Sequence, residues 1–168
     1  LVDELVRGGV RYAVVAPGSR SAPLALAAHR HPGLAVDVVL DERSAGFVAL
    51  GAAKVTGHAS LVVCTSGTAV ANLAPAVVEA SYSAIPLVVL TADRPVESRG
   101  VGAPQTIDQV QFFGSSVRFF ADLGAARRPD PSDPEAPTRA ARASVGMAIA
   151  AAVGATAGAT AGTAAAGR

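Results

Sequence analysis

Eight polar side chains of this sequence come within a few residues of the end of a short apolar run, and together they could bind a charged ligand. They are Ser19, Arg20, Glu42, Arg43, Ser66, Thr68, Asp93 and Arg94. An arginine fork matches the oxygens of a carboxylate or phosphate, and Glu42 adds an acid beside a predicted helix start. The alternative is a set of solvated loop charges with an incidental ion pair. The choice depends on whether the fold brings these side chains together.

The elements that must position these residues alternate between strands and helices. Short β-branched runs predict strands at residues 12–16, 34–40, 60–64 and 85–90, with a further strand at residues 119–123. Apolar residues at helical spacing predict helices at residues 1–7, 22–29, 42–57 and 68–83. The alternation indicates an α/β fold with a mostly parallel sheet and helices on both faces. Ligands of such sheets bind at the carboxyl ends of the strands, which fall near residues 17, 41, 65 and 92.

The composition divides the chain into three parts. Residues 1–127 carry the elements of the predicted α/β domain, and four prolines mark residues 128–138 as a linker. Residues 139–168 are rich in alanine and glycine, and a helix could extend to about residue 153. From Gly154 the sequence is of low complexity and has too little apolar bulk to offset chain entropy. We expect this tail to be partly helical or disordered.

Composition and charge exclude several classes of function. With 51% hydrophobic residues, 16% charged residues and a formal net charge of +1, bulk electrostatics favour neither nucleic acid nor a membrane surface. The first ten residues carry three charges and no long apolar core, so they do not resemble a secretory signal. The chain does not begin with methionine, and we expect it to be part of a longer gene product.

Residues typical of redox, metal and nucleotide sites are scarce. Cys64 is the single cysteine, which fits a reducing cytosol, and its apolar neighbours predict a small core residue rather than a nucleophile. The histidines at positions 29, 31 and 58 lack ligand spacing, so we predict no metal site from them. The glycine spacings of dinucleotide folds and P-loops do not occur.

Four blocks of sequence, in order and at close spacing, resemble one enzyme family. They are residues 16–24 (APGSRSAPL), 41–43 (DER), 65–73 (TSGTAVANL) and 90–95 (LTADRP). The family is that of the thiamine-diphosphate-dependent 2-succinyl-5-enolpyruvyl-6-hydroxy-3-cyclohexene-1-carboxylate synthases of menaquinone biosynthesis. The similarity runs from residue 1 to about residue 123 and covers the amino-terminal pyrimidine-binding domain. The high alanine, arginine and glycine content is similar to that of actinobacterial members.

The resemblance implies thiamine diphosphate as cofactor and a catalytic role for Glu42. In this family a glutamate hydrogen-bonds the N1′ atom of the aminopyrimidine and favours the 4′-imino tautomer, which removes the thiazolium C2 proton. Burial would raise the pKa of this carboxyl toward that task. Ser66 and Thr68 would also contact the cofactor, although capping of the following helix is the interpretation we favour for their hydroxyls. We expect the ligands of Mg²⁺ in a later domain that this sequence lacks.

The resemblance also implies two substrates. The cofactor's ylid attacks 2-oxoglutarate, carbon dioxide leaves, and the succinyl carbanion equivalent adds to isochorismate. Similar proteins bind the dicarboxylate isochorismate through residues that match Ser19, Arg20, Arg94 and Gln105. We therefore expect a cytoplasmic enzyme that is a homodimer or homotetramer at full length, and a fragment that is inactive alone.

Two other functions stay open. A different thiamine-diphosphate enzyme, of the acetolactate synthase or 2-oxo acid decarboxylase type, would share Glu42 and the fold. Arg20 and Arg94 favour a dicarboxylate acceptor instead, and isochorismate-dependent activity would separate the two. The alternative from a different class is a non-catalytic α/β binding or dimerisation module.

Overall fold

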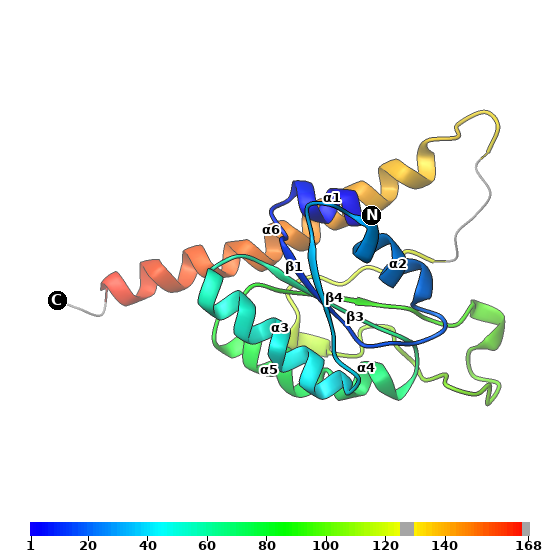
Figure 1. Ribbon diagram of the computed structural model, residues 1–168, viewed down its shortest axis with the longest axis horizontal. Helices are drawn as coiled ribbons and strands as arrows, with labels where there is room; N and C mark the ends of the chain where they lie inside the picture. The colour runs from blue at the N-terminus through cyan, green and yellow to red at the C-terminus, as the bar shows by residue number, and fades with distance from the viewer. Residues whose placement is uncertain (125–129, 166–168) are drawn as a thin grey trace.

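Four parallel strands form the sheet of this α/β protein (Figure 1). The computed structural model describes residues 1–124 and 130–165, with side chains up to residue 154. The strands are β1 (Tyr12–Val15), β2 (Ala35–Val38), β3 (Ser60–Cys64) and β4 (Leu87–Thr91). Their order across the sheet is β2-β1-β3-β4, and every neighbouring pair is parallel. The predicted α/β fold is confirmed.

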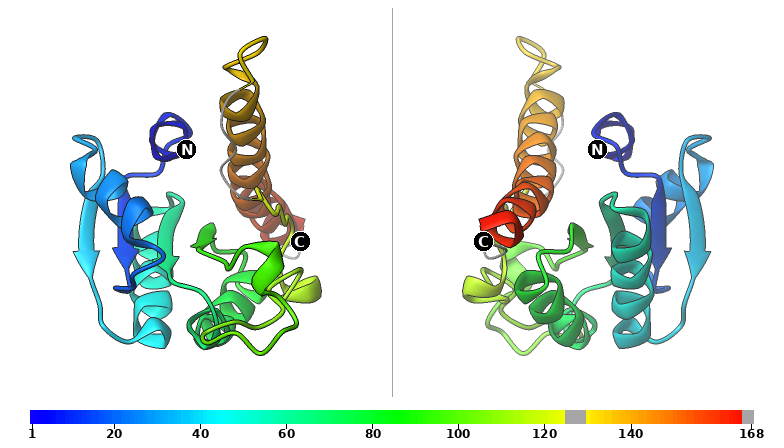
Figure 2. Two further views of the ribbon diagram at one scale, coloured as in Figure 1. Left: turned by 90° about the vertical axis from the view of Figure 1, so that its right-hand side faces the viewer. Right: turned by 90° about the vertical axis from the view of Figure 1, so that its left-hand side faces the viewer.

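Helices cover both faces of the sheet (Figures 1 and 2). One face carries α1 (Val2–Arg7), α2 (Ala22–Arg30) and α6 (Ala136–Ala165). The opposite face carries α3 (Glu42–Thr56), α4 (Thr68–Asn72) and α5 (Ala74–Tyr82). Two short 3-10 helices, η1 (Val96–Ser98) and η2 (Gly114–Ser116), lie in the long connection after β4. No helix in the described part of the chain is both long and apolar enough to cross a membrane.

The sheet divides the apolar core in two, because alternate residues of a strand point to opposite faces. In β1, Ala13 and Val15 join the core beneath α1, α2 and α6, whereas Val14 packs toward α3, α4 and α5. Strand β3 repeats this alternation and is buried along its whole length, as expected of a central strand covered on both faces. The carboxyl ends of β1 and β3 are therefore held beside each other by packing on both sides.

Local sequence places Glu42 at the first position of α3. Asp41 caps this helix, because its Oδ1 accepts hydrogen bonds from the backbone N–H and the Oγ of Ser44, both at 2.8 Å. These hydrogen bonds hold the pKa of Asp41 below its usual value. The cap and the positive end of the helix dipole both favour acids at this point of the chain.

The strand predicted at residues 119–123 is wrong. The segment pairs with no strand in the described part of the chain and forms an extended connection after η2. Side-chain contacts hold the segment in place instead: Arg118 donates a hydrogen bond to the backbone carbonyl of Ser81, and Asp122 pairs with Arg99. A short apolar run is typical of a strand, but a strand also needs a neighbour with free N–H and C=O groups.

The helix predicted at residues 68–83 is two helices. α4 ends at Asn72 and α5 begins at Ala74. Pro75 causes the division, since it has no backbone N–H to donate and its ring crowds the preceding turn. It is tolerated because it lies in the first turn of the new helix.

Helix α6 begins earlier and runs further than predicted. It starts at Ala136, within the predicted linker, because Pro137 fits the first turn of a helix. It continues to Ala165, through the region predicted to be weakly structured, and its end extends past the sheet (Figure 1). Val145 and Ile149 join the core beside α1, so the first part of α6 belongs to the packed domain. The start of the predicted linker, residues 128–129, lies outside the described residues.

Candidate ligand-binding site

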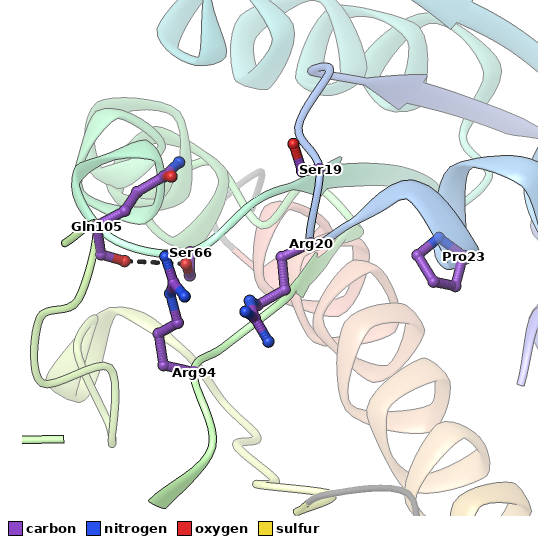
Figure 3. A pocket seen from close by; sticks show the side chains of 6 residues that line it. All are labelled: Ser19, Arg20, Pro23, Ser66, Arg94 and Gln105. Atoms are coloured by element: carbon purple, nitrogen blue, oxygen red, sulfur yellow. Dashed lines mark hydrogen bonds between the residues drawn. The ribbon is translucent and has the colours of Figure 1, made fainter. Parts of the chain in front are cut away.

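A pocket opens at the carboxyl edge of the sheet (Figure 3). Its volume is about 480 Å³, and its lining residues are Ser19, Arg20, Pro23, Ser66, Arg94 and Gln105. Pro23 lies in the first turn of α2, and the others come from three connections: the β1–α2 turn, the β3–α4 turn and the loop after β4. The structure thus brings together five residues of the predicted site and leaves Glu42 and Thr68 outside the pocket lining.

Two glycines let the three connections approach one another closely. A Cβ atom at Gly18 would lie 2.4 Å from the Cβ of Thr65, so the β1–α2 turn packs directly on the β3–α4 turn. Gly67 has a φ of 82°, and a Cβ atom there would lie 2.9 Å from the backbone carbonyl of Gln105. Because no side chain fits at either position without displacing its neighbour, both glycines are required for this pocket geometry.

Hydrogen bonds fasten the loop after β4 to the β3–α4 turn. Ser66 Oγ donates to the backbone carbonyl of Gln105 at 2.9 Å (Figure 3). The buried Gln109 accepts from the N–H of Gly67 at 3.0 Å and donates to the carbonyl of Ala92, also at 3.0 Å. Gln109 thereby joins the turn after β3 to the end of β4. Sequence reasoning did not find this residue, because nothing in its local pattern separates it from other loop glutamines.

The pocket is positively charged. Arg20 and Arg94 line it, and its lining contains no carboxylate. The Nε of Arg94 is buried and has no hydrogen-bond partner among the described residues. A buried donor without a partner is costly, and an anionic ligand would remove that cost. The arrangement therefore suits a ligand with carboxylate or phosphate groups.

Glu42 lies near the pocket edge of the sheet but not in the lining. Its side chain is partly exposed, and its Oε2 accepts a hydrogen bond from Asn72 Nδ2 at 3.3 Å. Burial, and after it the charge of Glu42, raises the pKa of the Cys64 thiol to about 12. The carboxylate of Glu42 therefore acts electrostatically on the end of β3. Cys64 is fully buried, which confirms the prediction of a core residue.

The predicted capping of α4 by Ser66 or Thr68 is wrong. The residue at the cap position is Gly67, and no side chain caps this helix. Its left-handed backbone and its contact with Gln105 leave no place for a larger residue there. Ser66 bonds the carbonyl of Gln105 instead, and Thr68 is an exposed first residue of the helix. Across the described residues, no group of three His, Cys, Asp or Glu side chains is arranged for a metal ion.

The fold and the site define the class of protein. Residues 1–112 match the family described as thiamine pyrophosphate enzyme, N-terminal TPP binding domain. The match covers most of the chain, from α1 to the loop that follows β4, and includes all the residues that line the pocket. The chain therefore belongs to this family, whose name gives the cofactor thiamine pyrophosphate, which is thiamine diphosphate.

Curated relatives narrow the class further. The chain is 63% identical over 124 residues to the 2-succinyl-5-enolpyruvyl-6-hydroxy-3-cyclohexene-1-carboxylate synthase of Myxococcus xanthus, a match that covers 74% of this chain and 21% of the relative. It is 62% identical over 123 residues to the synthase of the same name from Chloroflexus aurantiacus, covering 73% and 21%. With that of Geobacillus kaustophilus it shares 56% over 143 residues, covering 85% and 25%. The chain thus spans about a fifth to a quarter of the length of these relatives.

Proposed function

We propose that this chain is the pyrimidine-binding part of a transferase of menaquinone biosynthesis that adds the succinyl unit of 2-oxoglutarate to isochorismate. The observation that carries the proposal is the positively charged pocket at the sheet edge, with a buried Arg94 Nε that lacks a partner among the described residues. A dicarboxylate acceptor matches two arginine forks better than a neutral substrate does. The names of the relatives, which specify a carboxylate product, support this choice.

In this proposal the pocket residues bind and orient isochorismate. Arg20 and Arg94 enter the pocket from different connections, so each can hold a separate carboxylate. Ser19 and Gln105 complete the polar lining and fix the orientation of the ligand between the two cations. Because Ser66 holds the carbonyl of Gln105, it positions the loop as well as lining the site. Fixed placement of both carboxylates would present the ring of the acceptor in one orientation.

Glu42 is the proposed partner of the cofactor's pyrimidine ring, and Ser66 and Thr68 are proposed cofactor contacts. The partly exposed carboxylate at the start of α3 fits a nitrogen ring, because it can accept a hydrogen bond and hold a proton at Oε1 or Oε2. Asn72 donates to Oε2 and so orients the carboxyl group. Thiamine diphosphate, when bound, supplies the electron sink for decarboxylation of the 2-oxo acid.

Several components of the complete enzyme belong to the same proposal. We place the ligands of Mg²⁺ and of the diphosphate in the remaining length of the enzyme, since this chain spans about a fifth to a quarter of its relatives. We propose a cytoplasmic homodimer or homotetramer for the complete enzyme, and no activity for this chain alone. Of the predicted division into a domain (residues 1–127), a linker (residues 128–138) and a tail (residues 139–168), we propose to keep the domain and to add to it the first part of α6, because Val145 and Ile149 pack in its core.

A chimera tests the proposal. Residues 1–124 would replace the matching segment of the Myxococcus xanthus synthase, and consumption of isochorismate with 2-oxoglutarate would be measured. We expect activity, a loss in kcat of about 100-fold or more for Glu42→Gln, and a rise in KM for isochorismate of about tenfold or more for Arg94→Gln. Glu4→Gln is the matched control, because Glu4 lies on α1, on the opposite face of the sheet from α3 and Glu42. This substitution should change neither kcat nor KM for isochorismate. A chimera that is folded and binds cofactor, but whose turnover is unaffected by Glu42→Gln, would contradict the proposal.

A further inference from the structure

Arg99, which follows η1 in the loop after β4, contacts both the acid next to Arg94 and the backbone of Arg94 itself. Its Nη2 lies 2.7 Å from Oδ2 of Asp93, and Nη1 and Nη2 each donate to Oδ2 of Asp122 at 3.2 Å. Its Nε donates to the backbone carbonyl of Arg94 at 3.4 Å. One guanidinium group thus bridges two carboxylates and also contacts the backbone that carries the pocket cation.

Asp93 is the acid next in sequence to Arg94, and both of its oxygens already have partners. Oδ1 accepts a hydrogen bond from the backbone N–H of Arg94 at 2.6 Å, and Oδ2 pairs with Arg99. The Asp93 side chain is 21% exposed, so its charge is only partly screened by water. A carboxylate in this position without Arg99 would be an available partner for the nearest cation.

Asp122 supplies the second anchor of Arg99 from the extended segment after η2. Hydrogen bonding from the backbone N–H of Gly124, followed by the contact with Arg99, holds the pKa of Asp122 below its usual value. The carboxylate therefore stays ionised at neutral pH and stays paired with Arg99. Arg99 pairs with both Asp93 and Asp122, whereas Arg94 pairs with neither acid and lines the pocket.

We infer that Arg99 is a positioning residue: it keeps the Asp93 carboxylate from pairing with the guanidinium group of Arg94, and so leaves that group available to an anionic ligand. The inference rests on the proposed function only for the identity of that ligand, isochorismate. It adds a determinant that does not touch the ligand: Arg99 is absent from the pocket lining. In its absence, Asp93 would compete with the carboxylate of the ligand for the same guanidinium group.

The experiment uses the 168-residue chain in four forms: unsubstituted, Arg99→Gln, Asp93→Asn and the double variant. The first measurement needs no ligand and follows the ¹H–¹⁵N signal of Arg94 Nε–H, assigned by its loss in Arg94→Lys. In Arg99→Gln this signal should move downfield as Asp93 accepts from it, and in the double variant it should return to its original position. Arg7→Gln, which breaks an exposed pair with Asp3 on α1, is the control for loss of one arginine.

The second measurement is the affinity of the same four proteins for isochorismate by titration calorimetry. Arg99→Gln should weaken binding about tenfold, and adding Asp93→Asn should restore it to within about threefold of the Asp93→Asn protein. Rescue by the second substitution separates competition by Asp93 from a general loss of loop structure. A Nε–H signal that does not move in Arg99→Gln, or an affinity that the double variant fails to restore, overturns the inference. If the signal moves and returns as expected but no form binds isochorismate, the inference on Arg99 holds and the proposed ligand is wrong.

Discussion

The two faces of the sheet are built from different parts of the chain. The three helices of the α3–α5 face come from one stretch of sequence, residues 42–82, and its core includes small residues such as Ala45, Ala49 and Ala69. The face with α1, α2 and α6 needs segments from both halves of the chain, because Val145 and Ile149 pack beside Val2 and Leu5. The comparison indicates that the core of the first face is the more local in sequence, and that the core of the second depends on the docking of α6.

The largest expected effect tests the packing of the α3–α5 face. Leu73 is fully buried at the junction of α4 and α5, so Leu73→Ala should leave a cavity and lower the free energy of unfolding by about 3 kcal/mol. Urea denaturation followed by circular dichroism measures this change. Leu26→Ala on α2, a leucine that is 50% exposed, is the matched control and should cost less than about 0.5 kcal/mol. Equal losses for the two variants would contradict the burial of Leu73 in the core of this face.

A smaller loss is expected on the face with α6. Ile149 is 8% exposed and packs on the α1 end, where a Cβ atom at Gly8 would lie only 2.1 Å from its Cδ1. Ile149→Ala should lower the free energy of unfolding by about 2 kcal/mol, at the low end for such changes because the helix can shift at its edge. Native-state hydrogen exchange should show the loss first in α6 and α1. Met147→Ala, at an exposed position of α6, is the control. A loss in Ile149→Ala that exceeds that of Leu73→Ala would reverse the comparison.

The two faces should also differ in their response to alkaline pH. Cys64 belongs to the α3–α5 core, and burial raises its thiol pKa from 9.0 to about 12. Because the folded state holds this proton more tightly than the unfolded state, the stabilisation is complete below pH 9 and is lost as the pH rises from 9 toward 12. The slope should approach about 1.4 kcal/mol per pH unit for one proton. Denaturation curves between pH 8.5 and pH 10, roughly the range before tyrosine ionises in unfolded chains, measure it. Cys64→Ala should abolish the cysteine contribution, and an unchanged slope in that variant would refute the assignment.

The smallest expected effect concerns the ion pair between α6 and α1. Arg142 Nε lies 3.5 Å from Oε2 of Glu4, and the two side chains are 53% and 28% exposed. A double-mutant cycle with Arg142→Gln and Glu4→Gln should give a coupling energy of about 0.3 kcal/mol, since exposed pairs are screened. The coupling energy should decrease further in 0.5 M salt, because salt ions screen the two exposed charges. A coupling above about 1 kcal/mol would mean that charge, and not the packing of Ile149, docks α6.

Much of the fold could be predicted from local sequence patterns, that is, from residues close to one another in the chain. Residues 60–64 were predicted as a strand and form β3 with the same bounds, because a β-branched run between turn residues has few other solutions. The carboxyl edge where the polar residues meet also follows from the order of elements, which is why Ser19, Arg20 and Arg94 were expected together. The break between α4 and α5, just before Pro75, was not predicted.

The features that were predicted wrongly or not at all depend on contacts between residues distant in sequence. Whether residues 119–123 form a strand is decided by the presence of a free neighbouring edge, which a short apolar run does not predict. The roles of Gln109 and Arg99 depend on partners that are distant in sequence, such as Gly67 and Asp122. The prediction of a side-chain cap on α4 was wrong for the same reason. The backbone of Gln105 lies so close to the cap position that only glycine fits there, and this contact is between residues distant in sequence.

The order of strands has a consequence for how the chain folds. Tyr12 pairs with Ser60, across all of α2, β2 and α3, and no neighbouring pair in the sheet is a local hairpin. The entropy of closing these long loops must be lost before the contacts between strands stabilise the sheet. We therefore expect refolding on a time scale of about milliseconds to seconds, limited by the meeting of β1 and β3, while α3 and α5 form earlier as fluctuating helices. During that interval the apolar β3 has no partner on either side, so dilute conditions should favour recovery of the native protein.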